Sequence, residues 1–268
     1  MIKREGAVMK LSNLVTNVFL ALGLAATAQA QWIKLPLPDT PRDKDGKPVL
    51  SAPAPRTSDG HPDLSGIWIS ARNQFTNPKG RGLERYMPAG SKAPMTPAAE
   101  KFYAEITAHG DAPDPSESCL PDGVPNHMLP LPIKIVQTPK ETLMLFEEFT
   151  VFRQIFTDGR KLPVDPQPTF FGYSVAHWEQ NTFVVESAGF NDKTYIDGEG
   201  LPHSEDLQIT ERYRRPDFGH LVIEFTFTDP KNYERPWTAT VPFNLMPDTE
   251  LNEHLCENEK DHDLLYRK

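Results

Sequence analysis

Cysteine is scarce in this chain, and the two that occur stand far apart. Cys119 and Cys256 are the only ones among 268 residues. The paired cysteines of a structural zinc site are therefore missing, and the eight histidines form neither a His-x-His nor a His-Glu-x-x-His pattern. We expect no metal site from local spacing, while a site assembled from distant loops stays open.

Excess positive charge is lacking as well. The chain carries 28 lysines and arginines against 37 aspartates and glutamates, a net charge of −9. Proteins that bind nucleic acids need a basic surface, so we expect no nucleic-acid partner. Neither the glycine-rich turn of a dinucleotide site nor the Gly-x-Ser-x-Gly elbow of a serine hydrolase occurs, and we expect no bound cofactor.

No apolar run reaches the length of about 20 residues that a membrane span needs. The most apolar stretch, Leu11–Ala25, follows three basic residues and precedes the small-x-small sequence Ala28-Gln29-Ala30, as in an export signal. We predict a signal peptide over residues 1–30, cleavage before Gln31, a periplasmic or secreted location and no stable membrane insertion afterwards. An uncleaved anchor is the alternative.

Export bears directly on the two cysteines. Disulfides persist in oxidising compartments, so we predict a bond between Cys119 and Cys256. In the chain-entropy model, closing so long a loop stabilises the fold by about 4–5 kcal/mol before strain is subtracted. Two separate thiols are the alternative.

The stretch from Thr142 to Asp229 predicts an antiparallel β-meander. Its runs are rich in aromatic and β-branched residues, and turn residues separate them. Alternation predicts that Leu221, Ile223, Phe225 and Phe227 face the core. The expected strands are Leu143–Phe156, Tyr173–Trp178, Thr182–Phe190, Leu207–Arg214 and Leu221–Thr228.

A further strand is predicted at Leu64–Ser70, where Gly66-Ile67-Trp68 resembles the Gly-x-Trp motif that opens lipocalin and other calycin barrels. In those barrels the tryptophan plugs the closed end and an arginine packs on it; that arginine would be Arg212 or Arg214 here. We predict a mainly β fold, an antiparallel up-and-down calycin-like barrel with one or two short helices and a Pro-rich N-terminal arm.

Outside the meander the signals are more local. Thr96-Pro97 predicts a helix start, with Gly110 ending the helix. Ile133–Val136 is bracketed by prolines and predicts an edge strand, Trp237–Phe243 predicts a last strand, and Pro247 predicts the start of a short helix.

The chain divides into four expected parts. These are a signal peptide (1–30), a Pro-rich extended arm (31–63), a single barrel domain (64–257) and a charged tail (258–268). The arm contains a short repeat, since the Asp-Gly-x-Pro pattern of residues 41–51 returns in residues 55–65. We favour an arm that docks on the barrel over a flexible tether.

Motifs over most of the mature chain resemble a family of exported, largely uncharacterised bacterial proteins. The resemblance implies a secreted β-rich fold and no particular activity. The motifs are Pro62-Asp63-Leu64-Ser65-Gly66-Ile67-Trp68, Asp158-Gly159-Arg160, Gly172-Tyr173-Ser174, Trp178-Glu179, Gly200-Leu201-Pro202-His203-Ser204-Glu205, Glu211-Arg212-Tyr213-Arg214-Arg215 and Cys256-Glu257-Asn258.

His203 and Glu205 are the first candidates for chemistry, because a histidine near a carboxylate can act as an acid or base near neutral pH. Asp197 is an alternative orienting carboxylate. A hydrogen bond that only stabilises the loop is the competing interpretation.

Arginines are the second set of candidates. Arg160 or Arg212 would stabilise an anion, although a plain turn is the favoured interpretation of Asp158-Gly159-Arg160. Charges also occur within the strands, and any that point inward must be paired, because an isolated buried charge is prohibitive. These strand charges are Glu147, Glu148, Arg153, Glu186, Glu211, Arg212 and Glu224.

The leading functional hypothesis is a secreted barrel that binds a small, partly aromatic molecule. The alternative is a cofactor-independent lyase, isomerase or hydrolase with His203, Glu205, Arg160 and Arg212 at the barrel mouth. A structural envelope protein without a ligand is the third, and a closed, side-chain-filled interior would favour it. The oligomeric state is left open. The aromatic residues expected to line the binding cavity are Phe170, Phe171, Tyr173, Trp178 and Phe190.

Overall fold

The computed structural model describes residues 36–37, 39–71, 82–110 and 112–256. The predicted signal peptide and charged tail lie outside these residues. The chain divides into a unit of residues 37–247 and 251–268, which contains the barrel, and a unit of residues 1–36 and 248–250. In the described part of the chain, no helix is long and apolar enough to cross a membrane.

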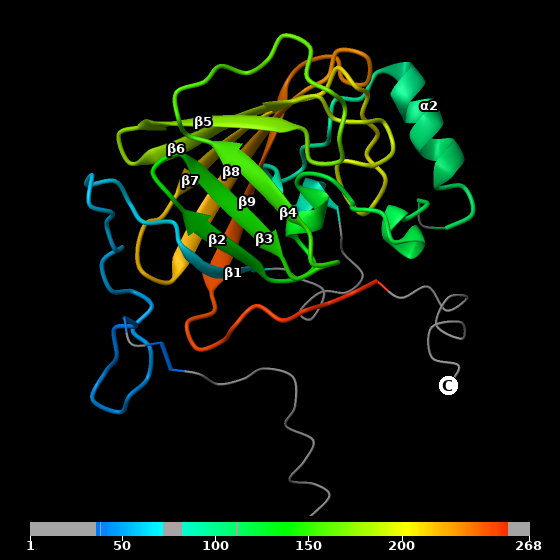
Figure 1. Ribbon diagram of the computed structural model, residues 1–268. Coiled ribbons are helices and arrows are strands. Elements are labelled where there is room, and N and C mark those ends of the chain that lie inside the picture. Colours follow the sequence, from blue (N-terminus) through cyan, green and yellow to red (C-terminus); the bar gives the residue numbers. More distant parts are fainter. Residues whose placement is uncertain (1–35, 38, 72–81, 111, 257–268) are drawn as a thin grey trace, which may run out of the picture. The chain divides into compact units, whose positions relative to one another are not determined.

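Nine strands form a closed barrel in chain order, so the predicted mainly β fold is confirmed (Figure 1). β1 pairs with both β2 and β9, which closes the ring. The strands are β1 (Gly66–Ser70), β2 (Ile133–Gln137), β3 (Glu141–Phe146), β4 (Phe152–Phe156), β5 (Tyr173–Glu179), β6 (Thr182–Ala188), β7 (Gln208–Arg214), β8 (His220–Thr228) and β9 (Trp237–Leu245).

The barrel departs from a pure up-and-down meander at one place. β4 and β5 are parallel, whereas all other neighbouring strands are antiparallel. Parallel neighbours need a connection of about a dozen residues or more, and residues 157–172 provide it. The expected single run Leu143–Phe156 is also wrong, because a turn with positive φ at Phe149 and Thr150 divides it into β3 and β4.

Two smaller predictions fail for physical reasons. β2 is no edge strand, because a closed barrel has no edges and both β1 and β3 pair with it. Residues 247–256 contain no helix; the pattern that suggested one is too short to form a helix without a packed face.

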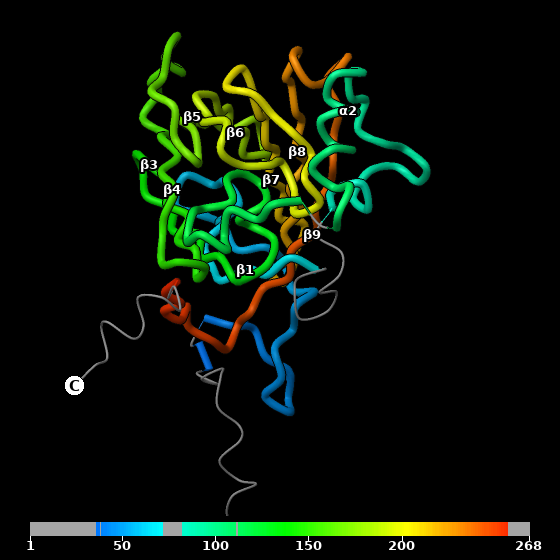
Figure 2. The backbone as a smooth tube through the Cα atoms, turned by 90° about the vertical axis from the view of Figure 1, so that its right-hand side faces the viewer, coloured from blue at the N-terminus to red at the C-terminus, as the bar shows by residue number. Residues whose placement is uncertain are grey.

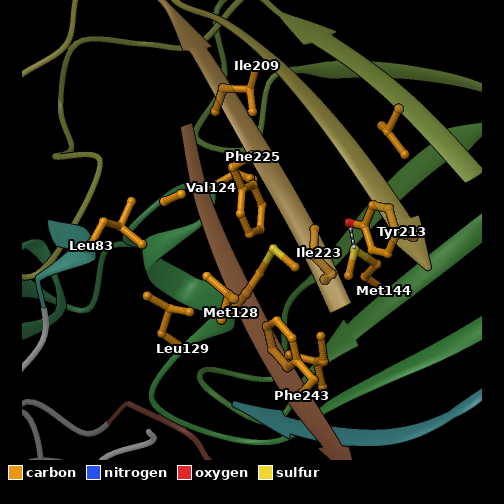
Figure 3. Close-up of a cluster of buried hydrophobic side chains, with 14 of the residues drawn as sticks. Leu83, Val124, Met128, Leu129, Met144, Ile209, Tyr213, Ile223, Phe225 and Phe243 are labelled. Carbon is orange, nitrogen blue, oxygen red and sulfur yellow. Dashed lines mark hydrogen bonds between the residues drawn. The ribbon is translucent and has the colours of Figure 1, made fainter. Parts of the chain in front are cut away.

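The predicted inner row of β8, Leu221 to Phe227, is buried throughout, as the alternation required. Segments outside the barrel complete its core. Val124, Met128 and Leu129 lie next to side chains from β8 and β9, and Leu83 lies beside them (Figure 3). These segments therefore add side chains to the barrel core.

Trp68 is fully buried, and its indole Nε1 donates to the carbonyl of Leu64 at 3.0 Å. The arginine that packs on it is Arg215, whose guanidinium carbon lies 4.8 Å from the ring centroid. The expectation of Arg212 or Arg214 is wrong: both share the outward-facing row of β7, whereas Arg215 follows the strand and bonds carbonyls of the turns.

The arm is docked rather than free. Its two repeat copies form equivalent tight turns, with N–H to carbonyl bonds of 2.9 Å from Asp43 to Lys47 and from Thr57 to His61. In the second copy the His61 ring stacks on Trp178, with centroids 4.5 Å apart and planes within 1°.

α2 (Pro97–Ile106) begins after Thr96, whose hydroxyl accepts from the N–H of Ala99, as Thr96-Pro97 predicted. It lies at the end of the barrel away from the arm (Figures 1 and 2). The short 3-10 helices are η1 (Leu83–Tyr86), η2 (Pro115–Ser118) and η3 (Asn126–Met128). The predicted Cys119–Cys256 disulfide is present.

Candidate functional site

His203 is held by two hydrogen bonds within the protein. Its Nδ1 lies 3.2 Å from the carbonyl of Ser204, and its Nε2 lies 2.8 Å from the hydroxyl of Thr194. Because a carbonyl only accepts, Nδ1 carries the hydrogen and Nε2 accepts from Thr194. Burial lowers the pKa of His203, so the imidazole is neutral at neutral pH.

The carboxylates expected to assist His203 have other environments. Glu205 is exposed, while Asp197 is buried and accepts the N–H groups of Leu83 (2.7 Å), Glu199 (3.1 Å) and Leu201 (3.1 Å). Burial raises the pKa of Asp197 to about 6. The structure thus places His203 and Asp197 as internal hydrogen-bonding groups of the loop and does not pair either with Glu205.

The two arginine candidates lie outside the barrel interior. Arg160 forms an ion pair with Asp158 at 2.6 Å, donates to the hydroxyl of Tyr173 at 3.0 Å and lies over the ring of Phe156. The hydrogen bonds from Arg160 lower the pKa of Asp158 to about 2.

Arg212 donates to a carboxylate oxygen of Glu179 at 2.6 Å on the outer face of the sheet. Its positive charge is therefore already compensated by a carboxylate of β5, which lies two strands away in the barrel. Arg160 and Arg212 each have a carboxylate partner of their own, and neither lies in the loop of His203.

The aromatic candidates have separate neighbours. Phe171 stacks on Phe146 with centroids 5.2 Å apart, whereas Phe190 is buried 6.5 Å from the ring of His203. Tyr173 lies at the first residue of β5, and Trp178 lies near its last residue under the arm. The remaining candidate, Phe170, is half-buried.

Two of the strand charges do point inward and are paired. Arg153 on β4 and Glu211 on β7 are both buried, and the guanidinium donates to the two carboxylate oxygens at 3.0 and 2.5 Å. Further bonds join Arg153 to the hydroxyls of Ser174 and Ser187, and the Tyr213 hydroxyl donates to Glu211 at 2.6 Å. The network stabilises the inside of the barrel.

A groove outside the barrel has the dimensions of a ligand site. Its volume is about 610 Å³, within the range of about 300–1,000 Å³ that is typical of small-molecule sites. The arm forms one wall, and the outer faces of β6, β7 and β8 with the turns beside them form the other. The lining residues are Pro53, Ala54, Arg56, Pro62, Asn181, Thr182, Arg214, Arg215, Pro216 and Val222.

The groove carries three arginines and no carboxylate in its lining. Arg56 donates to the carbonyl of Gly60 and to the side chain of Asn181. Burial lowers the pKa of Arg215 to about 10, so this side chain stays charged at neutral pH. Arg214 is exposed and makes no hydrogen bond or ion pair to another residue that the structure describes.

Comparison of the chain with protein-family models, with curated proteins and with solved structures finds no match. The functional argument therefore rests on the geometry of the groove and of the buried polar groups.

Sequence reasoning missed the groove because its walls come from segments far apart in the chain. Two signals pointed toward it without locating it. One is the run Glu211-Arg212-Tyr213-Arg214-Arg215, in which alternation places Arg214 on the outer face. The other is the second repeat copy, whose Arg56 and Pro62 form part of the wall.

Proposed function

We propose that this protein binds a small anionic molecule with an apolar, partly aromatic body in the groove between the arm and the outer face of β6–β8. The observation that carries the proposal is the presence of Arg56, Arg214 and Arg215 in the lining of one groove of ligand size. A barrel fold with buried aromatic clusters is compatible with such a role.

The preference for an anion follows from the charges in the groove. Arg214 is exposed, and a guanidinium matches a carboxylate or phosphate with two parallel hydrogen bonds. The hydrogen bonds of Arg56 and Arg215 go to neutral oxygens, and Asp63 and Asp217 lie outside the lining but close enough to interact with the charge of Arg215. The three guanidinium groups of the lining thus favour a negative group.

The preference for an apolar body follows from the rest of the lining. Pro53, Pro62 and Pro216 present rigid rings, and Ala54 and Val222 add apolar surface. Proline side chains lose no rotamer freedom on binding, so this wall is pre-organised for a flat ligand. Mostly apolar walls with a few placed polar groups are typical of small-molecule sites.

Docking of the arm is what creates the groove. The His61 ring stacks on Trp178, its Nδ1 lies 3.0 Å from the carbonyl of Gln180, and Arg215 donates to the carbonyl of Asp63. These contacts hold the second repeat copy over the sheet. The Cys119–Cys256 disulfide supports the proposed location in an oxidising compartment.

An acid–base enzyme centred on His203 has less in its favour. Both ring nitrogens of His203 are engaged by Thr194 and Ser204, and Glu205 points to solvent. A general acid or base must reach the proton that it transfers in the substrate. The groove, not this loop, therefore carries the proposal.

The test compares two arginines of the same strand. We expect Arg214→Gln to weaken binding of naphthalene-2-carboxylate, measured by isothermal titration calorimetry, by about 10-fold or more, since a hydrogen bond to a charged group contributes about 1.5–3 kcal/mol. Arg212→Gln is the matched control, because Arg212 lies outside the lining and is paired with Glu179.

The neutral analogue naphthalene-2-carboxamide separates charge from shape. It should bind the wild type more weakly than the carboxylate and should be insensitive to Arg214→Gln. Equal binding of acid and amide, or an equal effect of the two arginine substitutions, would contradict the proposed site.

A further inference from the structure

Three buried metal-ligating side chains meet at a place apart from the groove. Asp122 and His127 come from the segment around η3, and Glu148 comes from the turn between β3 and β4. Their ligand atoms all lie within 4.8 Å of one another. The exposed fractions of the side chains are 0% for Asp122, 0% for His127 and 11% for Glu148.

The hydrogen bonds of His127 indicate which ring nitrogen carries the hydrogen and which one could coordinate a cation. Nε2 lies 3.2 Å from the backbone carbonyl of Glu148, and Nδ1 lies 3.3 Å from the backbone N–H of Asp122. A carbonyl only accepts and an amide N–H only donates, so Nε2 carries the hydrogen and Nδ1 presents its lone pair. The amide contact is at the long end of the hydrogen-bond range.

Two carboxylates lie near Nδ1. Glu148 Oε2 lies 3.3 Å and Asp122 Oδ2 lies 3.7 Å from Nδ1. In this tautomer Nδ1 and the two carboxylate oxygens all present lone pairs, as the ligands of a cation do. Imidazole nitrogen and carboxylate oxygen are both common ligands of divalent metals.

The spacings match those around a divalent metal. Bonds of about 2.0–2.2 Å in a tetrahedral site separate neighbouring ligand atoms by about 3.3–3.6 Å. The distance of 3.3 Å from Nδ1 to Glu148 Oε2 lies in this range, and the distance of 3.7 Å to Asp122 Oδ2 exceeds it by about 0.1 Å. A set of one imidazole and two carboxylates, without thiolates, suits Zn²⁺ or Mn²⁺ and leaves coordination positions for water or another ligand.

The surroundings of His127 also fit a metal ligand. Histidine ligands usually donate their other ring N–H to a carbonyl or carboxylate, which fixes the ring, and Nε2 of His127 does so to Glu148. The rings of Phe146, Phe149 and Phe171 lie around the imidazole, with centroids 5.1, 5.7 and 5.4 Å away. Such a shell excludes water and strengthens electrostatic attraction to a cation.

We propose that Asp122, His127 and Glu148 form a binding site for one divalent transition-metal ion, with His127 Nδ1 and one oxygen of each carboxylate as ligands. The ion would join the segment that packs into the barrel core to the β3–β4 turn. This site goes beyond the proposed groove, with which it shares no residue.

The first test is metal binding by the intact mature protein after treatment with a chelator. We expect Zn²⁺ to bind at one equivalent in calorimetric titration and to raise the melting temperature in proportion to the logarithm of its concentration. If neither Zn²⁺ nor Mn²⁺ binds when each is present at 100-fold excess, the proposal is overturned.

Substitutions then locate the ion. His127→Gln and Glu148→Gln should each weaken Zn²⁺ binding by about 100-fold or more, since even outer-shell changes cost about 10–100-fold. His203→Gln is the matched control, a histidine in a different loop with two internal hydrogen bonds. Binding that survives in both cluster variants, or is lost in His203→Gln, would overturn the assignment.

A measurement on the wild type keeps the proposal testable if a variant does not fold. Long-range proton–nitrogen correlation spectra report each histidine ring. We expect Zn²⁺ to move the Nδ1 resonance of a single histidine that keeps its Nε2 hydrogen. A shift at Nε2 instead, or shifts spread over several histidines, would contradict coordination by His127.

Discussion

Replacement of Arg153 by methionine tests whether water is excluded from the charged groups inside the barrel, as their burial indicates. The Arg153 side chain is 1% exposed and that of Glu211 is 0% exposed. Methionine fills similar volume but removes the donors to both oxygens of Glu211 and to Ser174 and Ser187. The substitution therefore leaves a carboxylate buried with only the hydroxyl of Tyr213 as a donor.

The magnitude follows from the charge that is left behind. Breaking a buried ion pair by removing one partner costs about 3–5 kcal/mol, whereas replacing both partners by apolar groups is often close to neutral. We expect Arg153→Met to lower the free energy of unfolding by about 3–5 kcal/mol. The double variant Arg153→Met/Glu211→Leu should recover at least about 2 kcal/mol of this loss, so the two substitutions are strongly non-additive.

Urea denaturation followed by tryptophan fluorescence and circular dichroism provides the assay, with the wild type, both single variants and the double variant forming a cycle. Arg212→Met is the control, because Arg212 lies on the outer face and pairs with the half-exposed Glu179; we expect a change of about 1 kcal/mol or less. A loss below about 1 kcal/mol for Arg153→Met would show that water reaches Glu211 and would refute the reasoning.

Three further predictions concern other buried groups. Trp68→Ala should lower the free energy of unfolding by about 3–5 kcal/mol, as for other large core side chains; a loss below about 1 kcal/mol in urea denaturation would contradict its role in the core. His203→Gln should cost about 1–2 kcal/mol through the lost bonds to Thr194 and Ser204, whereas unchanged stability with lost turnover on an identified substrate would favour catalysis. Burial raises the folded-state pKa of Asp197 to about 6, above its ordinary value of 3.8, so the folded protein binds this proton more tightly. The free energy of unfolding of the wild type, relative to that of Asp197→Asn, should therefore rise by about 1 kcal/mol as the pH falls from 7 to 5, and this contribution is lost as the pH rises through 6. If denaturation shows the same pH dependence of stability for both proteins, the prediction is contradicted.

Strand positions and their inner faces followed from the sequence because a barrel strand repeats every two residues. Phe225 and Phe227 had to share a face with Ile223, and all three are buried. The Gly-x-Trp pattern was informative for a similar local reason. Gly66 has φ +143°, a conformation that other residues rarely adopt, and a Cβ there would lie 2.7 Å from Leu245 Cδ1, which would have to shift.

Features that depend on how a strand ends were not predictable in this way. Alternation correctly separates Glu211 and Tyr213 from Arg212 and Arg214, but it says nothing of a residue beyond the last rung. Arg215 leaves the strand and turns over Trp68. The turn at Phe149 and Thr150, which divides the first predicted run, was likewise not predictable. Both residues have a positive φ, and the sequence gives no sign of it, because aromatic and β-branched residues disfavour that conformation.

The site residues were the hardest to predict, because local patterns report neighbours in the chain and sites consist of neighbours in space. The loop of His203 drew attention through residue types that stand close together, yet its His and carboxylates bind different partners. Asp122, His127 and Glu148 have no ligand spacing, but the packing of η3 against the β3–β4 turn brings them within 4.8 Å.

A physical asymmetry explains why burial, rather than motif, singles out the groups that matter here. An exposed pair such as Arg160 and Asp158 loses little if it is broken, because water replaces the lost bonds. The same atoms in a buried place must be compensated in full, so a fold retains them only where partners or ligands complete their bonds. Arg153 and Glu211 complete each other through the barrel interior. His127 Nδ1 lies 3.3 and 3.7 Å from two buried carboxylate oxygens, and the proposed cation would bind all three atoms.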